Sequence, residues 1–335
     1  MKAMVLQAPM GLDRLMLEDR PDPGTPGAGE IRVRLHGSTL NFHDLGVATG
    51  QMPAQAPRVP LADGGGVVEA VGEGVTEFAA GDAVVSCFFP DWEDGTAQIG
   101  DFSRTPGDGI DGYAREVAVV PARFFTHAPK GFSAVEAAAI TTAGLTAWRA
   151  LIGDGQLKAG DTVLLLGTGG VSIWALQIAK AMGATVAITS SSGEKLERAR
   201  DLGADFTLNY RETQDWGAKV REWTGGLGVD HVVEVGGPGT LAQSIEAVRV
   251  GGHISLIGVL TGAAGEVPTA ALMGKQARLQ GLIVGSRRQQ QDFVRALDSG
   301  TIRPVIDCTF ALEELGDAFR YEMSAAHFGK IGVAW

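Results

Sequence analysis

The spacing of apolar residues changes near residue 125 and divides the chain into two regions. Before this point the apolar runs are short and are separated by glycine and proline turns: AMVLQ, EIRVRLHG, GGVVEAVGEGV, DAVVSCF and AREVAVV. Short runs bounded by such turns are typical of strands joined by tight connections. We therefore predict an antiparallel, β-rich module over residues 1–125.

From about Phe132 apolar runs alternate with segments of helical spacing. The runs cover residues 162–166, 185–189, 206–209, 231–235, 253–259 and 279–284. Between two of them, Ile173, Leu176, Ala179 and Met182 recur at the period of a helix. Strands joined by helical crossovers form parallel sheets, so this α/β region predicts a doubly wound, six-stranded parallel sheet over residues 126–285.

The last fifty residues change pattern again. Two helical patterns, at 289–299 and 312–323, precede a closing strand that reads GKIGVAW. A chain of 335 residues is too long for one ordinary core. We expect residues 286–335 to return to the first module, so that the second domain is inserted in the first.

Composition narrows the functional classes. The chain is 45% apolar and 20% charged, with a net charge of -11 and no basic cluster, which argues against a nucleic-acid partner. The first residues, MKAMVLQAPMG, do not form a signal peptide, and no apolar run reaches the ~18 residues of a membrane span. We expect a cytoplasmic protein without membrane contact. Two cysteines, Cys87 and Cys308, exclude a disulfide framework and a cysteine-rich zinc site.

A glycine turn joins the first strand of the second region to its first helix. Gly167, Gly169 and Gly170 form it together with Thr168 and Val171. Glycines at such a junction permit a tight turn and let the backbone approach a pyrophosphate, which the helix N-terminus stabilises. The turn predicts a dinucleotide site.

The end of the next strand predicts which dinucleotide is bound. NAD-binding folds usually place an acid there to accept hydrogen bonds from the adenosine ribose. This chain has Ser190 and Ser191 instead, with Lys195 one helical turn later and Tyr210 at the tip of the following strand. Hydroxyl groups and a positive charge suit a 2′-phosphate, so we predict NADP(H) as the cofactor.

Several motifs together resemble the medium-chain dehydrogenase/reductase superfamily over nearly the whole chain. They include GGGVVEAVGEGVTEFAAGDAVV, AGLTAWRAL, LKAGDTVLLLGTGGVSIWALQIAKAMGATV, LGADFTLNY, GVDHVVEVGG and HFGKIGVAW. The resemblance implies a GroES-like catalytic domain, a Rossmann-type coenzyme domain and a substrate cleft between them.

The sequence departs from the zinc-containing members of that family. Where they have a cysteine, a histidine and a second cysteine, this chain has Asn41, Ala62 and Thr142. The lobe that carries structural cysteines in those relatives has one cysteine here. Zinc requires thiolate, imidazole or carboxylate ligands, so we predict no metal. Asp63 and His43 are a conceivable remnant pair.

The chain thus resembles the zinc-independent branch, which contains quinone oxidoreductases, alkene reductases and zinc-free alcohol dehydrogenases. Without a Lewis acid, hydride transfer suits acceptors that delocalise charge. We expect an NADPH-dependent enzyme that reduces a small apolar quinone or α,β-unsaturated carbonyl. The alternatives are a zinc-independent alcohol dehydrogenase or carbonyl reductase, and an NADPH-binding protein with little turnover.

Candidate catalytic residues are Asn41, His43 and Asp44. By resemblance, Asn41 and Thr146 line the nicotinamide pocket, although a turn cap is an alternative role for Asn41. His43 is a candidate proton donor, with solvent or a structural role as the alternatives, and Asp44 matches a positioning acid. The resemblance extends the coenzyme contacts to Thr142, Val235, Gly236, Ile257, Gly258, Val259, Ile283, Val284, Phe328 and Lys330.

The roles of two further segments are considered from their apolar character. Residues 88–92, FFPDW, are either a wall of an apolar substrate pocket or a hydrophobic plug that replaces the lost zinc lobe. The run RLQGLIVG is apolar enough to be a sheet edge that pairs across a dimer axis, as relatives often arrange it. We therefore expect a homodimer.

Overall fold

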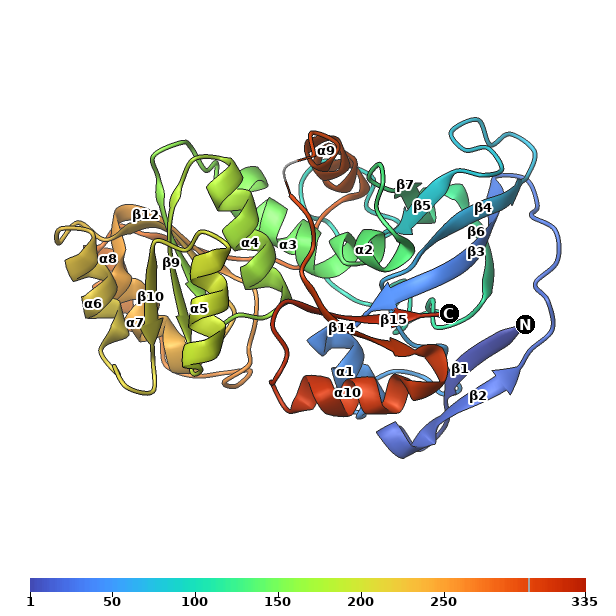
Figure 1. The fold of residues 1–335 in the computed structure, drawn as a ribbon, viewed down its shortest axis with the longest axis horizontal. Coiled ribbons are helices and arrows are strands. Elements are labelled where there is room, and N and C mark those ends of the chain that lie inside the picture. Colours follow the sequence, from blue (N-terminus) through green and yellow to red (C-terminus); the bar gives the residue numbers. More distant parts are fainter. Residues whose placement is uncertain (301) are drawn as a thin grey trace. The chain divides into compact units, whose positions relative to one another are not determined.

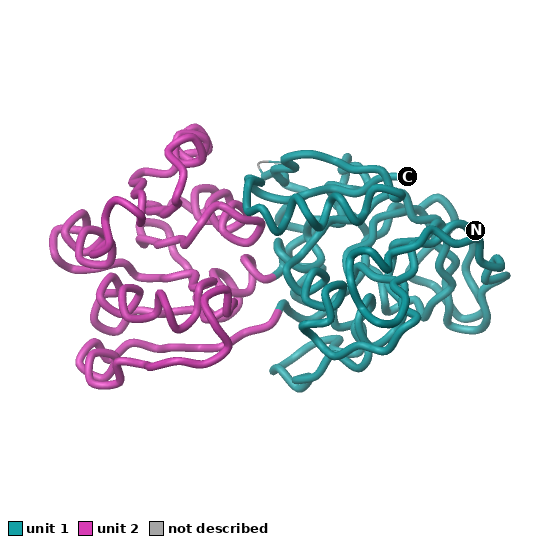
Figure 2. Tube along the Cα trace, turned by 90° about the horizontal axis from the view of Figure 1, so that it is seen from below, with its two compact units in different colours: residues 1–145, 284–335 teal, residues 146–283 magenta. Residues whose placement is uncertain are grey.

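The computed structural model describes residues 1–300 and 302–335, and the chain forms two compact units. Unit 1 comprises Met1–Leu145 and Val284–Trp335, and unit 2 comprises Thr146–Ile283 (Figure 2). The C-terminal segment belongs to unit 1, as the closing strand pattern predicts. The chain passes from unit 1 into unit 2 within the helix α3 (Leu145–Trp148).

Residues 126–145 belong to unit 1, whereas the periodicity placed them in the second domain. Helix α2 (Ala134–Ala138) contacts strands of the first sheet. Glycine makes this approach possible, because a Cβ at Gly65 would lie 2.0 Å from the backbone oxygen of Ala134. Helical periodicity indicates that a helix forms, but it does not say which sheet the helix covers.

Unit 2 contains the predicted parallel sheet. Its strands run in the order β10-β9-β8-β11-β12-β13, and each neighbouring pair is parallel (Figure 1). The strands are β8 (Thr162–Leu166), β9 (Thr185–Ser190), β10 (Phe206–Asn209), β11 (Val229–Glu234), β12 (Val248–Leu256) and β13 (Arg278–Gly281). The helices are α4 (Gly170–Ala181), α5 (Gly193–Asp201), α6 (Trp216–Trp223), α7 (Pro238–Ala247) and α8 (Thr269–Gly274). The doubly wound topology is confirmed, and β13 forms one edge.

The helices of unit 2 pack on the sheet through the apolar residues that the periodicity selects. Helix α4 contacts β8 and β9, and α7 contacts β11 and β12. Ile173 and Leu176 of α4 are buried, as are Leu241 and Ile245 of α7. Helical spacing therefore identified the buried faces correctly.

Unit 1 is built on a mainly antiparallel sheet with the path β14-β15-β3-β4-β5-β7, and β6 pairs with β3. These strands are β3 (Glu30–Thr39), β4 (Gly65–Val71), β5 (Ala83–Ser86), β6 (Val117–Pro121), β7 (Phe125–His127), β14 (Ile306–Ala311) and β15 (Lys330–Ala334). A separate antiparallel pair joins β1 (Lys2–Leu6) to β2 (Leu15–Asp19). The helices of unit 1 other than α2 are α1 (Phe42–Ala48), α9 (Arg287–Leu297) and α10 (Leu315–Met323).

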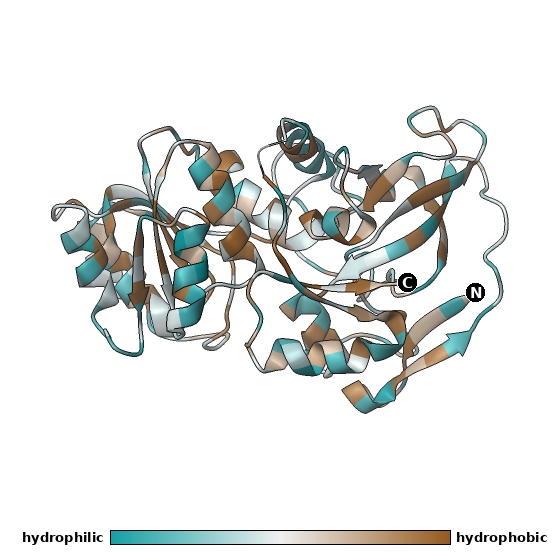
Figure 3. Cartoon of the chain, viewed as in Figure 1, coloured by the Kyte–Doolittle hydropathy of each residue, from teal (hydrophilic) through white to brown (hydrophobic). Residues whose placement is uncertain are grey.

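The C-terminal strands complete the sheet of unit 1. Strand β15 pairs antiparallel with β3, and β14 pairs parallel with β15. The pattern did not predict β14, β2 or β7. In β3, Ile31, Val33 and Leu35 alternate with more exposed residues and form part of the core. Figure 3 shows hydrophobic and hydrophilic positions mixed along the strands of both units. In the part of the chain that the structure describes, no helix is both long and apolar enough to span a membrane.

Candidate functional site

Asn41 follows β3 and begins helix α1. Its amide nitrogen donates to Asp44 Oδ2 over 3.0 Å, and its backbone N–H donates to the same oxygen over 3.1 Å. Asp44 also accepts the backbone N–H of Ala62 over 3.0 Å. Burial raises the pKa of Asp44 to about 6, and the charge of Asp63 adds to this effect. Asp44 therefore fixes the start of α1.

Asp63 is fully buried and lies at the centre of a hydrogen-bond cluster. Its Oδ2 accepts the hydroxyl of Thr39 over 2.5 Å and the amide of Asn41 over 3.0 Å. Its Oδ1 accepts the hydroxyl of Thr142 over 2.6 Å. Two residues that stand at ligand positions of zinc-containing relatives, Asn41 and Thr142, therefore both donate to this one carboxylate.

Lys330 supplies the positive charge of the cluster. It comes from the first position of β15, and its side chain is only 4% exposed. The ammonium donates to Asn41 Oδ1 over 2.6 Å and to the backbone oxygen of Leu40, and lies 3.5 Å from Asp63 Oδ2. A buried ammonium needs such partners because an unpaired charge is costly in the interior. We call Asn41, Asp63, Thr142 and Lys330 the Asp63 cluster.

The Asp63 cluster does not fit a zinc ion. Asn41, Ala62 and Thr142 offer no thiolate or imidazole. The Asp63 carboxylate already accepts three hydrogen bonds and forms an ion pair with Lys330. Among the residues that the structure describes, no group of three or more histidine, cysteine, aspartate or glutamate side chains is arranged to hold a metal.

His43 lies beside the Asp63 cluster on α1 but pairs with a different acid. Its Nε2 lies 3.3 Å from Asp108 Oδ2, and the histidine is largely buried. Its ring is 4.6 Å from that of Phe102 and 5.3 Å from that of Phe88, measured between centroids. The suggested His43 and Asp63 pair is therefore not formed. Asp108, which lies in a glycine-rich loop, was missed by the sequence analysis.

The FFPDW segment is mostly interior. Phe88 and Phe89 are each 2% exposed and Trp92 is 4% exposed. Phe88 and Phe89 meet edge to face at 4.8 Å, and Phe89 stacks on Phe102 at 6.2 Å. This packing favours the hydrophobic plug over the substrate wall, because buried rings contribute core stability.

Glu322 of α10 is a further buried acid close to these charges. Burial raises its pKa to about 8, with Lys330 opposing the shift and the charges of Asp44 and Asp63 adding to it. The folded protein thus holds a proton that the unfolded chain releases above about pH 4.5. Stability should therefore fall as pH rises from about 4.5 to 8.

Replacing Glu322 with glutamine tests this linkage. Between pH 6.5 and 8, above the pKa of Asp44, the unfolding free energy of the wild type should decline by at most about 1.4 kcal/mol per pH unit. We expect the variant to show little of this decline. Urea unfolding at several pH values measures it. Equal slopes for the variant and the wild type would refute a protonated Glu322.

The glycine turn of unit 2 has the geometry of an anion site. Gly167 has a φ of +72°, and a Cβ there or at Gly169 would meet no atom within 4 Å. No side chain caps the N-terminus of α4. Ser172, in the first turn of α4, donates to the backbone oxygen of Leu166 over 2.7 Å, which holds the helix against β8. Thr168 is buried in the turn and Val171 is half-buried.

The hydroxyl oxygens of Ser190, the last residue of β9, and of Ser192 accept backbone N–H groups. Ser190 Oγ accepts the backbone N–H of Ser192 over 3.3 Å, and Ser192 Oγ accepts that of Lys195 over 3.4 Å. A hydroxyl that accepts a backbone N–H can still donate its own proton. Tyr210 is exposed, and its backbone N–H donates to Ser190 O over 3.1 Å. These groups therefore lie at the ends of the adjacent strands β9 and β10.

The structure also places the other residues that the resemblance implied. In unit 2, Thr146 and Gly236 are buried, Val235, Ile257 and Gly258 are half-buried, and Val259 and Ile283 are exposed. In unit 1, Val284 and Phe328 are buried. In unit 2, the turn residues 167–171 lie beside the strand ends at residues 190–191 and 210. In unit 1 the Asp63 cluster unites Asn41, Thr142 and Lys330.

Sequence analysis missed Glu234, which lies at the end of β11. This fully buried carboxylate accepts the N–H groups of Gly236 and Gly237 over 2.7 and 3.0 Å. It also accepts the hydroxyls of Thr240 and Ser244. The acid thus fixes the turn from β11 to α7. An acid at the end of an otherwise apolar run was the available signal.

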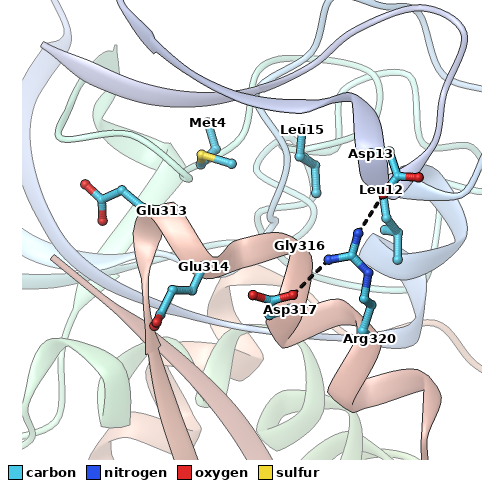
Figure 4. A pocket seen from close by; sticks show the side chains of 9 residues that line it. All are labelled: Met4, Leu12, Asp13, Leu15, Glu313, Glu314, Gly316, Asp317 and Arg320. Carbon is cyan, nitrogen blue, oxygen red and sulfur yellow. Dashed lines mark hydrogen bonds and ion pairs between the residues drawn. The ribbon is translucent and has the colours of Figure 1, made fainter.

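A pocket at the surface of unit 1 is lined by several acidic side chains (Figure 4). It lies between the β1 and β2 region and α10, and Asp13, Glu313, Glu314 and Asp317 line it. Its one cation, Arg320, donates to Asp13 over 2.6 Å and to Asp317 over 2.8 Å. None of the predicted site residues lines this pocket.

Two family models match the chain. The model described as an alcohol dehydrogenase GroES-like domain matches residues 27–130, and the model described as a zinc-binding dehydrogenase matches residues 170–299. A zinc-type alcohol dehydrogenase-like protein of Schizosaccharomyces pombe is 41% identical over 330 residues, covering 96% of this chain and 95% of the relative. A 2-haloacrylate reductase of a Burkholderia species is 30% identical, covering 98% and 97%.

Solved structures of similar proteins superpose on this chain. An NAD-dependent alcohol dehydrogenase superposes with a TM-score of 0.90 at 34% identity, over the full length of both chains. A mycobacterial protein in complex with NADPH superposes with a TM-score of 0.84 at 28% identity, also over both full lengths. The fold thus combines a GroES-like domain with a Rossmann-type sheet. The chain belongs to the medium-chain dehydrogenase/reductase superfamily of nicotinamide-dependent oxidoreductases.

Proposed function

We propose that the protein is an NADPH-dependent oxidoreductase that needs no zinc and passes hydride to a quinone or an α,β-unsaturated carbonyl compound. The Asp63 cluster carries this proposal. Its ammonium and carboxylate replace the donor set that a Lewis-acid metal requires. An acceptor that already delocalises negative charge has the least need of such a metal.

The proposed coenzyme supplies hydride when it is bound. In unit 2, the turn at Gly167 and Gly169 and the uncapped start of α4 would hold its pyrophosphate. Ser190, Ser191 and Lys195 would hold a 2′-phosphate, since no carboxylate stands at the end of β9 to repel it. The NADPH complex of the mycobacterial structure supports this choice, whereas the NAD-dependent structure shows that relatives differ.

The name of the Burkholderia relative supports an activated alkene as acceptor, because 2-haloacrylate contains a C=C bond conjugated to a carboxylate. Within unit 1, His43 beside Asp108 is a candidate proton donor, and the buried aromatic residues around it limit access of water. We further propose that β13, which forms a sheet edge, joins two copies in a homodimer.

Two other functions remain as alternatives. The yeast relative is described as alcohol dehydrogenase-like, and His43 with Asp108 would serve proton transfer in a reversible alcohol dehydrogenase or carbonyl reductase. A coenzyme-binding protein with little turnover would need only the features of unit 2. Substrate preference separates these functions.

The first experiment measures NADPH consumption, with NADH in parallel, against quinones, enones and plain aldehydes. The protein is first treated with a strong chelator. We expect quinone or enone reduction with NADPH, and a rate within about 2-fold of the untreated protein, because the donor set does not suit zinc. Turnover of plain aldehydes alone would favour the carbonyl reductase. Loss of the rate after chelation would refute a zinc-free mechanism, and binding without consumption would favour the non-catalytic alternative.

A further inference from the structure

Two loops of unit 2 leave the sheet side by side and are joined by a backbone hydrogen bond. They follow β11 and β12 and cover residues 235–237 and 257–262. The N–H of Thr261 donates to the backbone oxygen of Gly236 over 2.8 Å. Because β8, β11 and β12 are parallel neighbours, both loops lie at the same edge of the sheet as the glycine turn after β8.

The buried Glu234 carboxylate fills the N-terminus of α7 from inside the protein. Its Oε1 accepts the N–H groups of the two glycines before the helix. Pro238, the first residue of α7, has no N–H, and the N–H of Gly239 donates to Thr261 Oγ1 over 2.8 Å. The N–H groups between residues 236 and 240 therefore all have acceptors within unit 2, whereas no side chain caps α4.

Thr261 bridges the two loops with its hydroxyl. Its Oγ1 donates to the backbone oxygen of Gly236 over 2.7 Å and accepts the N–H of Gly239. The loops approach closely at Gly258, where a Cβ would lie 2.3 Å from the backbone oxygen of Val235. Thr261 is exposed, so its hydrogen bonds join the loops at the surface, whereas the carboxylate holds the first loop from the interior.

The winding of the sheet places one half of a dinucleotide over these loops. The chain runs outward from β8 in both directions, through β9 and β10 on one side and through β11, β12 and β13 on the other. Dinucleotides bind across such a reversal, at the carboxyl ends of the strands. The proposed function puts the pyrophosphate at the turn after β8 and the 2′-phosphate at the end of β9. The nicotinamide half would then lie over the ends of β11 and β12.

We propose that Glu234 and Thr261 are positioning residues, which hold the two loops as a preformed surface for the nicotinamide half of the coenzyme. The proposal rests on the proposed function, because it needs a nicotinamide dinucleotide at the turn after β8. Glu234 places a negative charge at the start of α7, which repels a phosphate there and leaves α4 to receive the pyrophosphate. The coenzyme is thereby held in one register, and neither loop has to become ordered when it binds.

Replacing Thr261 with valine tests the inference, because valine keeps the shape of threonine and removes both hydrogen bonds of the hydroxyl. The probes are NADPH and adenosine 2′,5′-bisphosphate, which has the phosphate-bearing adenosine half and lacks nicotinamide. By isothermal titration calorimetry, we expect the Kd of NADPH to rise about 10-fold and that of the bisphosphate to stay within about 2-fold of the wild type. Thr261→Ser, which keeps the hydroxyl, should bind both probes as the wild type does.

Glu234→Gln tests the support from the interior. Glutamine has the shape of glutamate, but the charge is lost and one acceptor oxygen becomes an NH2 group. We expect the Kd of NADPH to rise about 5- to 10-fold, again with the bisphosphate within about 2-fold of the wild type. Equal weakening of both probes would show that the carboxylate supports unit 2 as a whole, and would overturn its role as a positioning residue.

Thr162→Val is the matched control. The Thr162 hydroxyl also bridges two strands, since it donates to Asp230 Oδ2 over 2.9 Å and accepts the N–H of Asp230 over 3.1 Å. It belongs to the first residue of β8, at the opposite end of that strand from the glycine turn. This variant should bind both probes as the wild type does.

The outcomes separate the inference from the proposed function. A Thr261→Val variant that binds NADPH within about 2-fold of the wild type, or that weakens both probes alike, overturns the inference and leaves the proposed function intact. A wild-type protein that binds neither probe overturns the proposed function and the inference together.

Discussion

Replacing Asp63 with asparagine is expected to lower the free energy of unfolding by about 3 to 5 kcal/mol. The substitution keeps the size of the side chain but leaves the Lys330 ammonium without a counter-charge at a site where its side chain is 4% exposed. Urea unfolding measures the effect as a lower midpoint with an unchanged slope. A loss below 1 kcal/mol would show that the pair contributes little.

A double-mutant cycle separates the ion pair from packing. Lys330→Met alone removes the ammonium, and Asp63→Asn with Lys330→Met removes both charges. The double variant should be more stable than the sum of the single losses predicts, because neither charge is left unpaired. Asp317→Asn is the control, since its ion pair with Arg320 is exposed and should contribute less than about 1 kcal/mol. Additive losses would contradict direct coupling.

Replacing Lys195 with alanine is expected to weaken NADPH binding about 10- to 100-fold, with NADH binding within about 3-fold of the wild type. In the variant, the 2′-phosphate of NADPH loses a charge-assisted hydrogen-bond partner, whereas NADH has no such phosphate. Ser191→Asp should shift the preference further toward NADH, because a carboxylate repels the phosphate and accepts from the ribose hydroxyls. Dissociation constants for both coenzymes measure the two effects.

Lys180→Ala provides the matched control for coenzyme selectivity. Lys180 lies in the last turn of α4, pairs with Asp205 over 2.7 Å and is far along the helix from the glycine turn. The variant should bind both coenzymes as the wild type does. Unchanged NADPH affinity in Lys195→Ala would refute the assignment of the 2′-phosphate site.

The local patterns predicted unit 2 better than unit 1. Parallel strands such as β8 and β9 are buried apolar runs between helices, so periodicity located most of the sheet and the glycine turn. Strands such as β14 carry mixed polar residues, because much of that strand is only half-buried. β14 joins the sheet through β15, and β15 pairs with β3, which is far away in the sequence.

The candidate site was predictable residue by residue but not as a cluster. Asn41, Thr142 and Lys330 were each selected, yet Asp63 was not recognised as their common acceptor, and Asp108 and Glu234 were missed. Asp63 and Asp108 contact residues far away in the sequence, which spacing does not encode, whereas the contacts of Glu234 are local. The signal that was available is Lys330 itself, since a lysine at the start of an apolar strand requires a buried acid.

The position of Lys330 near the C-terminus has a consequence for biosynthesis. Asp63 and Lys330 are separated by 267 positions, and the whole of unit 2 lies between them in the chain. During translation Asp63 is made long before its counter-charge, and a chain that stops before residue 330 never acquires it. The cluster therefore makes stability of unit 1 conditional on complete synthesis, so truncated chains should be recognised as unfolded and degraded.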